Sequence, residues 1–181
     1  MITKITKSLT LGGWLLIGFL SILPVTVGQG PPRPTAFTHI PQLIGASTTN
    51  QVTNRFGPTY HLRLETLDQM NIPLARIRLV QIQGVSTIRF IPEQTRGSVG
   101  SNRAIAVTLL QDEKNRTTDI ILDPPIGAAE QLTIELRPFR NPRVAGTYQF
   151  SVTAIPDGDG AIGNQIGVAR LQFFNSSGLS P

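Results

Sequence analysis

From residue 60 onward, apolar side chains recur at every second position of the chain. Successive side chains of a β-strand point to opposite faces of the sheet, so a period of two is the pattern of a half-buried strand. We identify eight candidate strands. Seven alternate in this way, and the one at 120–122 is a short continuous apolar run. The eight stretches are residues 60–64, 77–79, 88–90, 105–109, 120–122, 132–136, 148–154 and 169–173.

Turn signals separate these stretches, among them Arg96-Gly97, Pro124-Pro125 and residues 157–160. No segment carries a long apolar stripe of helical period, and the best helix candidate is the short stretch at residues 64–70. Regularly spaced short strands with turns between them favour an antiparallel sandwich over alternating strands and helices. The sequence therefore predicts an all-β, immunoglobulin-like sandwich of about eight strands.

Tyr148 makes this fold class more specific. It stands near the start of the longest predicted strand, two residues before Phe150. In immunoglobulin-like domains a tyrosine at this corner bonds to upstream backbone, and the residue two positions later enters the core. The alternative is that Tyr148 is simply a core aromatic residue.

Residues 1–28 have the pattern of a secretory signal peptide. Lys4 and Lys7 precede an uncharged, strongly apolar run, and small residues follow it near Gly28. This order of charge, apolar run and small residues predicts export followed by cleavage. The alternative is an uncleaved membrane anchor, because the uncharged run is long enough to span a bilayer as a helix.

The remaining chain divides by composition. Residues 29–58 are rich in Pro, Ser and Thr, which predicts a linker or loosely ordered arm, although Phe37, Ile40, Leu43 and Ile44 offer apolar contacts for docking a short piece. Residues 59–175 form the predicted sandwich, and residues 176–181 form a tail. The whole chain has no cysteine. Disulfides, thiolate metal sites and cysteine nucleophiles are therefore excluded.

The net charge of the chain is +5. A mild positive charge favours anionic surfaces such as acidic polysaccharide or lipid headgroups, although it also serves plain solubility. We expect no nucleic acid partner for an exported protein. Membrane contact is expected only through an uncleaved N-terminal segment.

In the C-terminal half an Arg-Asn-Pro motif is followed by Gly-x-Tyr-x-Phe-x-Val-Thr-Ala-x-Pro. Together with neighbouring motifs, these residues lie at 123–126, 132–138, 140–143, 146–156 and 167–171. With these motifs the chain resembles, over about residues 60–174, the cyanobacterial secreted family catalogued as domain of unknown function 2808. The resemblance implies an exported protein of the periplasm, cell envelope or thylakoid lumen. It implies no catalytic residue.

Residues with catalytic or metal-binding potential are few. His39 and His61 have no companion histidine or serine–acid pattern, and residues 97–101 lack the spacing of a nucleophile elbow. Asp112 with Glu113, and the acidic turn at 157–160, read as turns rather than as a hydrolytic pair or a full calcium loop. We expect no enzyme activity, no cofactor and no metal.

The best candidate contact surface lies between the last two long predicted strands. It consists of Arg137, Phe139, Arg140, Asn141 and Arg143. Guanidinium groups suit carboxylate, sulfate or phosphate, and an exposed aromatic ring can stack on a sugar. The structural alternative is that the arginines pair with Asp119, Asp123 or Glu135 and pin a connection between the two sheets.

Three functions remain open at this point. The first is a non-enzymatic envelope module that binds an anionic glycan, a lipid headgroup or an envelope protein. The second is a structural or assembly component of the envelope that pairs through strand edges. The third is an unrecognised hydrolase with residues gathered from distant loops.

Overall fold

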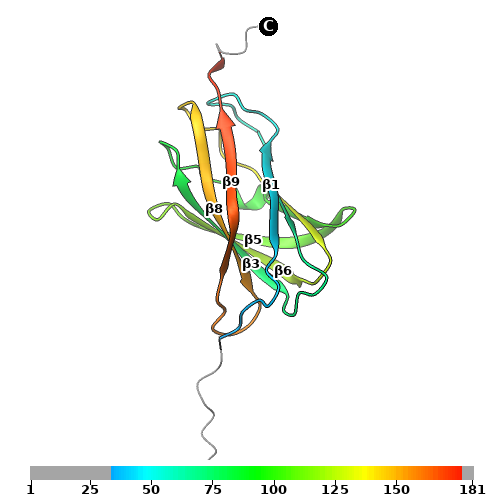
Figure 1. Cartoon of the computed structure of the whole chain (residues 1–181). Coiled ribbons are helices and arrows are strands. Elements are labelled where there is room, and N and C mark those ends of the chain that lie inside the picture. The colour runs from blue at the N-terminus through cyan, green and yellow to red at the C-terminus, as the bar shows by residue number, and fades with distance from the viewer. Residues whose placement is uncertain (1–33, 177–181) are drawn as a thin grey trace, which may run out of the picture. The chain divides into compact units, whose positions relative to one another are not determined.

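The computed structural model describes residues 34–176, and this part of the chain is an antiparallel all-β domain (Figure 1). It contains the 3₁₀ turn η1 (Pro92–Gln94), and no helix in the described residues has the length and apolarity to cross a membrane. The strands are β1 (Gln42–Thr48), β2 (Tyr60–Glu65), β3 (Leu74–Gln83), β4 (Arg96–Val99), β5 (Arg103–Asp112), β6 (Thr117–Ile126), β7 (Gln131–Leu136), β8 (Gly146–Pro156) and β9 (Asn164–Phe173).

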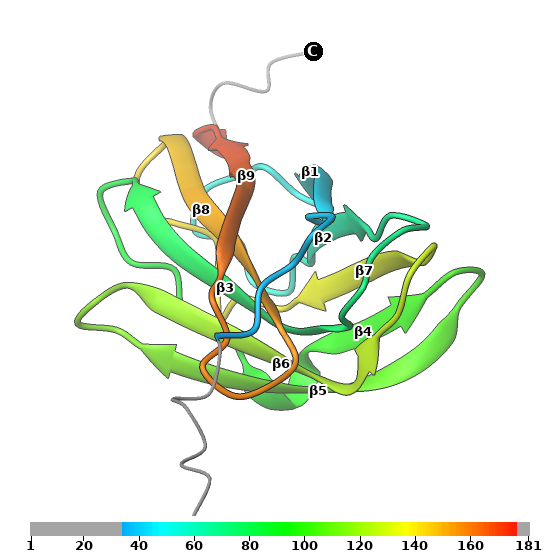
Figure 2. The ribbon, with the colours of Figure 1, turned by 60° about the horizontal axis from the view of Figure 1, so that its bottom comes forward.

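The nine strands form one continuous sheet that folds over into two layers. Its order is β1-β2-β7-β4-β5-β6-β3-β8-β9. Strand β5 joins the layers, because its beginning pairs with β4 and its continuation from Ala106 pairs with β6. The two edge strands β1 and β9 lie side by side, which Figures 1 and 2 both show.

The alternating apolar residues meet between the layers and form the core. Burial of each such side chain stabilises the fold by about 1.5–3 kcal/mol relative to leaving it in water. The side chains with at most 1% exposure include Leu64, Leu74, Ile77, Ile120, Ile126, Leu132, Ile134, Val152 and Phe173.

Tyr148 forms the predicted corner. Its hydroxyl donates a hydrogen bond to the carbonyl oxygen of Val144 at 3.1 Å, four residues upstream. Its ring packs edge-on against Phe173, and Phe150 is buried in the core. The prediction of an immunoglobulin-like sandwich is confirmed, with nine strands where about eight were expected.

The expected arm at residues 29–58 contains a strand in its described part. Strand β1 pairs with β2 along its length, and Phe37 is buried in the core. The polar composition concealed this strand, because an edge strand gains much of its stability from backbone hydrogen bonds that any residue type can make. The sandwich therefore begins before residue 59. Residues 1–33, with the predicted signal peptide, and residues 177–181 of the tail lie outside the described part.

Three local expectations differ from the structure. Arg96-Gly97 begins strand β4 rather than a turn, and an added side chain at Gly97 would meet Ile105 and Val107 at 2.7 Å. Glycine is thus needed there for close contact between β4 and β5. Pro124 and Pro125 lie inside β6, where Asp123-Pro124 is a cis bond. The helix candidate at 64–70 is instead the end of β2 and a loop.

The stretch at residues 88–90 alternates like a strand but forms only an isolated bridge between Phe90 and Pro138. Two glutamine side chains replace the neighbouring strand. Gln111 accepts from the Phe90 amide at 2.8 Å and donates to its carbonyl at 2.9 Å. Gln81 accepts from the Ile88 amide and donates to the carbonyl of Ser86, both at 2.9 Å. These bonds hold the loop after β3 in place.

Strand direction separates the connecting loops into two groups at opposite ends of the sandwich. The register places Tyr60 beside Leu136, and Glu65 beside Gln131. One end therefore carries the loops at 49–59, 84–95, 113–116 and 137–145, which we call the basic pole. The other end carries residues 34–41, 66–73, 127–130 and 157–163, which we call the acidic pole.

Candidate functional site

Asn141 anchors the connection between β7 and β8 inside the protein. Its side chain is completely buried, and its Oδ1 accepts a hydrogen bond from the Tyr60 hydroxyl at 2.8 Å. Its Nδ2 donates to the carbonyl oxygens of Asn50 at 2.9 Å and Val52 at 2.7 Å. Asn141 was predicted to contact a ligand, but both of its N–H donors are occupied. It shapes the site rather than offering a free donor.

Burial also acts on the phenol that bonds to Asn141. It raises the pKa of Tyr60 well above its usual value, and interaction with Tyr148 raises it further. Tyr60 therefore stays neutral and keeps donating its proton to the amide. The connection is fixed by a neutral hydrogen-bond network instead of by charge.

Arg140 is held by two exposed aromatic rings. Its guanidinium carbon lies 5.0 Å from the ring centre of Phe56 and 5.3 Å from that of Phe139. The rings meet edge to face at 5.9 Å, and Nη1 of Arg140 donates to Oδ1 of Asn54 at 3.2 Å. Contacts of a guanidinium with ring faces contribute about 0.5–1 kcal/mol at exposed sites. The charge of Arg140 is therefore held in one position at the surface.

The other two predicted arginines differ in role. Arg137 donates from Nη1 to the carbonyl of Gly57 at 3.1 Å and ties two loops of the basic pole together. Arg143 is exposed. Within residues 34–176, no carboxylate oxygen lies within 4.0 Å of the guanidinium groups of Arg137, Arg140 or Arg143.

The expected acidic partners of these arginines are engaged elsewhere or lie apart. Asp119 forms a two-point ion pair with Arg78, at 2.7 and 2.9 Å. Glu135 lies 3.9 Å from His61. The connection is thus pinned by Asn141 and Arg137 through hydrogen bonds to backbone, and not by the ion pairs of the structural alternative.

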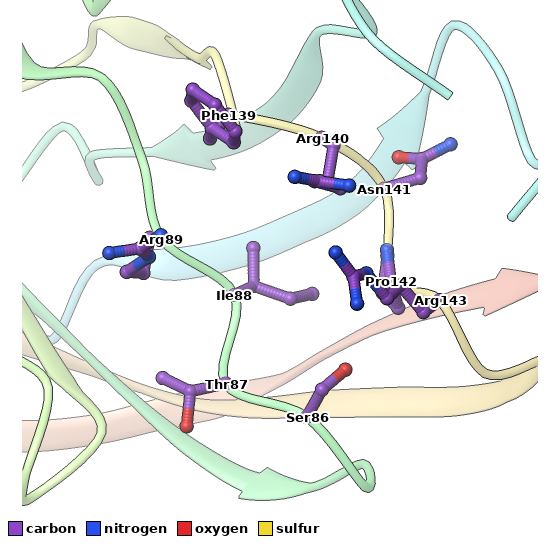
Figure 3. A pocket seen from close by; sticks show the side chains of 9 residues that line it. All are labelled: Ser86, Thr87, Ile88, Arg89, Phe139, Arg140, Asn141, Pro142 and Arg143. Carbon is purple, nitrogen blue, oxygen red and sulfur yellow. The ribbon is translucent and has the colours of Figure 1, made fainter. Parts of the chain in front are cut away.

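A pocket of about 220 Å³ opens between this connection and the loop that follows β3 (Figure 3). Ile88 extends from one loop into the space between the two, as the figure shows. The pocket is lined by Ser86, Thr87, Ile88, Arg89, Phe139, Arg140, Asn141, Pro142 and Arg143. We call it the arginine pocket.

Arg89 is a pocket residue that sequence reasoning missed. The amide of Phe139 donates to the carbonyl of Arg89 at 3.0 Å, and this bond brings the two loops together. Nη1 of Arg89 lies 3.5 Å from Glu113, but both side chains are more than half exposed, so solvent weakens the pair. Sequence alternation marked Arg89 only as the polar residue between Ile88 and Phe90.

Charge is separated between the two ends of the sandwich. The loops of the basic pole hold seven Lys and Arg residues and two Glu residues. The loops of the acidic pole hold four Asp and Glu residues and no Lys or Arg. One of the four, Glu130, pairs with Arg103 at the start of β5. Separation of this kind favours anions at the basic pole over the acidic pole.

The sequence matches a family model over residues 34–173, which is most of the chain. The family is described as "Protein of unknown function (DUF2808)". The chain belongs to this family. No curated protein matches it.

Solved structures with a similar arrangement share little sequence with this family member. They include the RrgA Jo.In complex (12% identity, 71% of this chain and 79% of that chain covered, TM-score 0.44). The collagen-binding domain of a Staphylococcus aureus adhesin matches at 11% identity, with 65% of this chain and 87% of that chain covered and a TM-score of 0.40. The major pilin SpaD of Corynebacterium diphtheriae matches at 10% identity, with 73% of this chain and 34% of that chain covered and a TM-score of 0.46. Likenesses this distant carry no argument about function.

The other candidates from the sequence do not assemble into a second site. His39 bonds to Thr38, and the loop of Asp112 is closed by Asn115, whose hydrogen bonds lower the pKa of that carboxyl. No three His, Asp or Glu side chains within residues 34–176 lie close enough together to hold a metal ion. The arginine pocket is therefore our candidate functional site in this family member.

Proposed function

We propose that this protein is a non-enzymatic binding module of the cell envelope, and that its arginine pocket takes an anionic group of its partner. The observation that carries the proposal is that Arg140 and Arg143 line one pocket, whereas the side chain of Arg89, on the facing loop, points away from it (Figure 3). Arg140 and Arg143 have no carboxylate partner among the described residues. Planar guanidinium forks match the oxygens of carboxylate, sulfate and phosphate groups.

The structure of the pocket also supports binding rather than catalysis. Its lining residues include no histidine and no carboxylate that could move a proton. The pocket instead offers positive charge in a fixed shape. Buried Asn141 holds one wall, and the amides of Gln81 and Gln111 hold the other. A site held in its binding geometry avoids part of the entropy cost of association.

Export and the envelope location are part of the same proposal. Residues 1–28 support it through their signal-like order of charge and apolar run, and the family resemblance supports a cyanobacterial periplasm, envelope or thylakoid lumen. Cell fractionation with N-terminal sequencing is the test. We expect a mature chain that begins near Gln29, whereas a membrane-bound chain that still carries Lys4 and Lys7 would show that the segment is an anchor.

Binding is tested by electrophoresis through gels that contain polygalacturonate or dextran sulfate, which carry carboxylate and sulfate groups. We expect both polymers to retard the protein, and Arg143→Ala to weaken the retardation several-fold. Arg63→Ala is the matched control, because Arg63 is exposed on β2 and outside the pocket. Equal effects of the two substitutions would mean that retardation depends on net charge alone and that the arginine pocket is not the binding site.

A further inference from the structure

We propose that the anionic group taken by the arginine pocket is the acidic turn at residues 157–160 of a second copy of this chain. Copies would then associate head to tail. This inference rests on the proposed function, because it names the partner of the same site. Two features of the molecule carry it: the separation of charge between the poles and the fixed shape of the turn.

The acidic turn presents two carboxylates that nothing in the described chain neutralises. Asp157 and Asp159 are exposed, and no Lys or Arg among the described residues lies within 4.0 Å of their oxygens. The loops around them hold no basic side chain at all. The turn thus places two exposed, unpaired carboxylates at the end of the sandwich opposite the arginine pocket.

Hydrogen bonds also hold the backbone of the turn. The Asp157 amide donates to Pro73 at 2.9 Å, and Thr35 donates from Oγ1 to the carbonyl of Asp159 at 3.1 Å. Gly158 has a φ of +122°, and an added side chain there would meet Thr35 at 2.8 Å. The two carboxylates are therefore presented on a backbone that is ordered before contact, which lowers the entropy cost of docking.

The pocket is small, with a volume of about 220 Å³, and the one aromatic ring in its lining is already in use. The ring of Phe139, which could stack on a sugar, already carries the guanidinium of Arg140 at 5.3 Å. What the pocket still offers is charge, and opposite charge on two approaching surfaces speeds their encounter and fixes their orientation.

The positions of the two poles determine the kind of assembly. Pocket and turn lie at opposite ends of the same domain, so a contact between them leaves a free pocket on one copy and a free turn on the other. Such a heterologous contact repeats into open rows instead of closing as a two-fold dimer. Because its main attraction is between charged groups, we expect it to weaken strongly with salt.

The test uses the full chain, expressed with its own N-terminal segment, in sedimentation velocity at low salt and at about 0.5 M salt. We expect dimers and longer species that grow with protein concentration at low salt and monomers at high salt. Arg143→Glu disrupts the arginine pocket, and Asp159→Lys disrupts the acidic turn. Each variant alone is expected to stay monomeric, and an equal mixture is expected to form heterodimers and nothing longer.

Arg63→Glu is the matched control, and it should associate as the unchanged protein does. Association that persists in either single variant, or a mixture that stays monomeric, would overturn the inference. The test also separates this inference from the proposed function. A protein that remains monomeric at low salt yet is retarded by polygalacturonate in an Arg143-dependent manner keeps the pocket and loses the second copy as its partner. Loss of both results rejects both proposals.

Discussion

Asn141 lines the arginine pocket, but its side-chain amide is bonded inside the protein. Its place among three arginines suggested ligand contact, yet its amide bonds to Tyr60 and to two backbone carbonyls inside the protein. Sequence alone could not reveal this, because the partners lie more than 80 positions away along the chain. Its neighbours Phe139 and Arg143 are exposed, as a contact surface requires.

Replacement of Asn141 by alanine is expected to lower the free energy of unfolding by about 1–3 kcal/mol, because the Tyr60 hydroxyl and two carbonyls lose their partner while buried. Chemical denaturation measures this. Arg143→Ala is the comparison, since exposed Arg143 should change stability by no more than about 0.5 kcal/mol. A large loss in Arg143→Ala would mean that the arginine supports folding and not only binding.

Tyr60 makes stability depend on alkaline pH. An unfolded tyrosine ionises near pH 10, whereas burial raises the pKa of Tyr60 in the folded protein far above that. Below about pH 10 the phenol is neutral in both states and stability does not change through this group. Above it the unfolded chain loses the proton first, so stability falls as pH rises.

Urea unfolding between pH 8 and about pH 11 compares the protein with Tyr60→Phe. The variant should be less stable at pH 8, because Asn141 loses a donor, but it should lose less additional stability at high pH. Parallel pH profiles for the two proteins would be inconsistent with a buried neutral phenol.

At the scale of elements, alternation identified seven of the nine strands, from β2 to β9 without β4. It failed at β1 and β4, where small and polar residues hide a strand that depends on its partner's backbone. It also indicated a strand at 88–90, where glutamine side chains take the place of a neighbour. Alternation of apolar residues indicates which side chains are buried. It indicates that two strands pair only where both strands contribute side chains to the core.

Phe37 tests whether the first part of the chain belongs to the sandwich. Phe37 and Phe56 both lie within the expected arm at 29–58, but Phe37 is 8% exposed and Phe56 is 63% exposed. Phe37→Ala should lower the free energy of unfolding by about 3–5 kcal/mol, as expected for a buried phenylalanine. Phe56→Ala should cost no more than about 0.5 kcal/mol. Similar small losses for both would mean that the segment is a linker after all.

At the scale of the whole molecule, charge separation was not visible in the sequence. The net charge of +5 is modest, and basic and acidic residues are mixed along the chain. Folding sorts them, because alternate loops of an antiparallel sandwich lie at opposite ends. The site is likewise formed from loops more than 45 positions apart, of which only residues 137–143 were singled out beforehand.

The charge separation should orient the protein on any anionic surface with its basic pole toward that surface. The chain has no cysteine, so single cysteines can report this. Val144 at the basic pole and Ile162 at the acidic pole are similarly exposed, at 45% and 49%. On phosphatidylglycerol vesicles at low salt, Val144→Cys should react more slowly with a water-soluble maleimide than Ile162→Cys. Equal protection of the two sites would contradict a fixed orientation.

The most direct test of the arginine pocket is a map of amide chemical shifts during titration with a short oligogalacturonide, a soluble ligand that carries carboxylates. We predict that the largest changes occur at residues 86–89 and 139–143, and that they shrink as salt increases. Changes centred on strands β4 and β5, or the same pattern of changes in Arg143→Ala, would contradict binding at the arginine pocket.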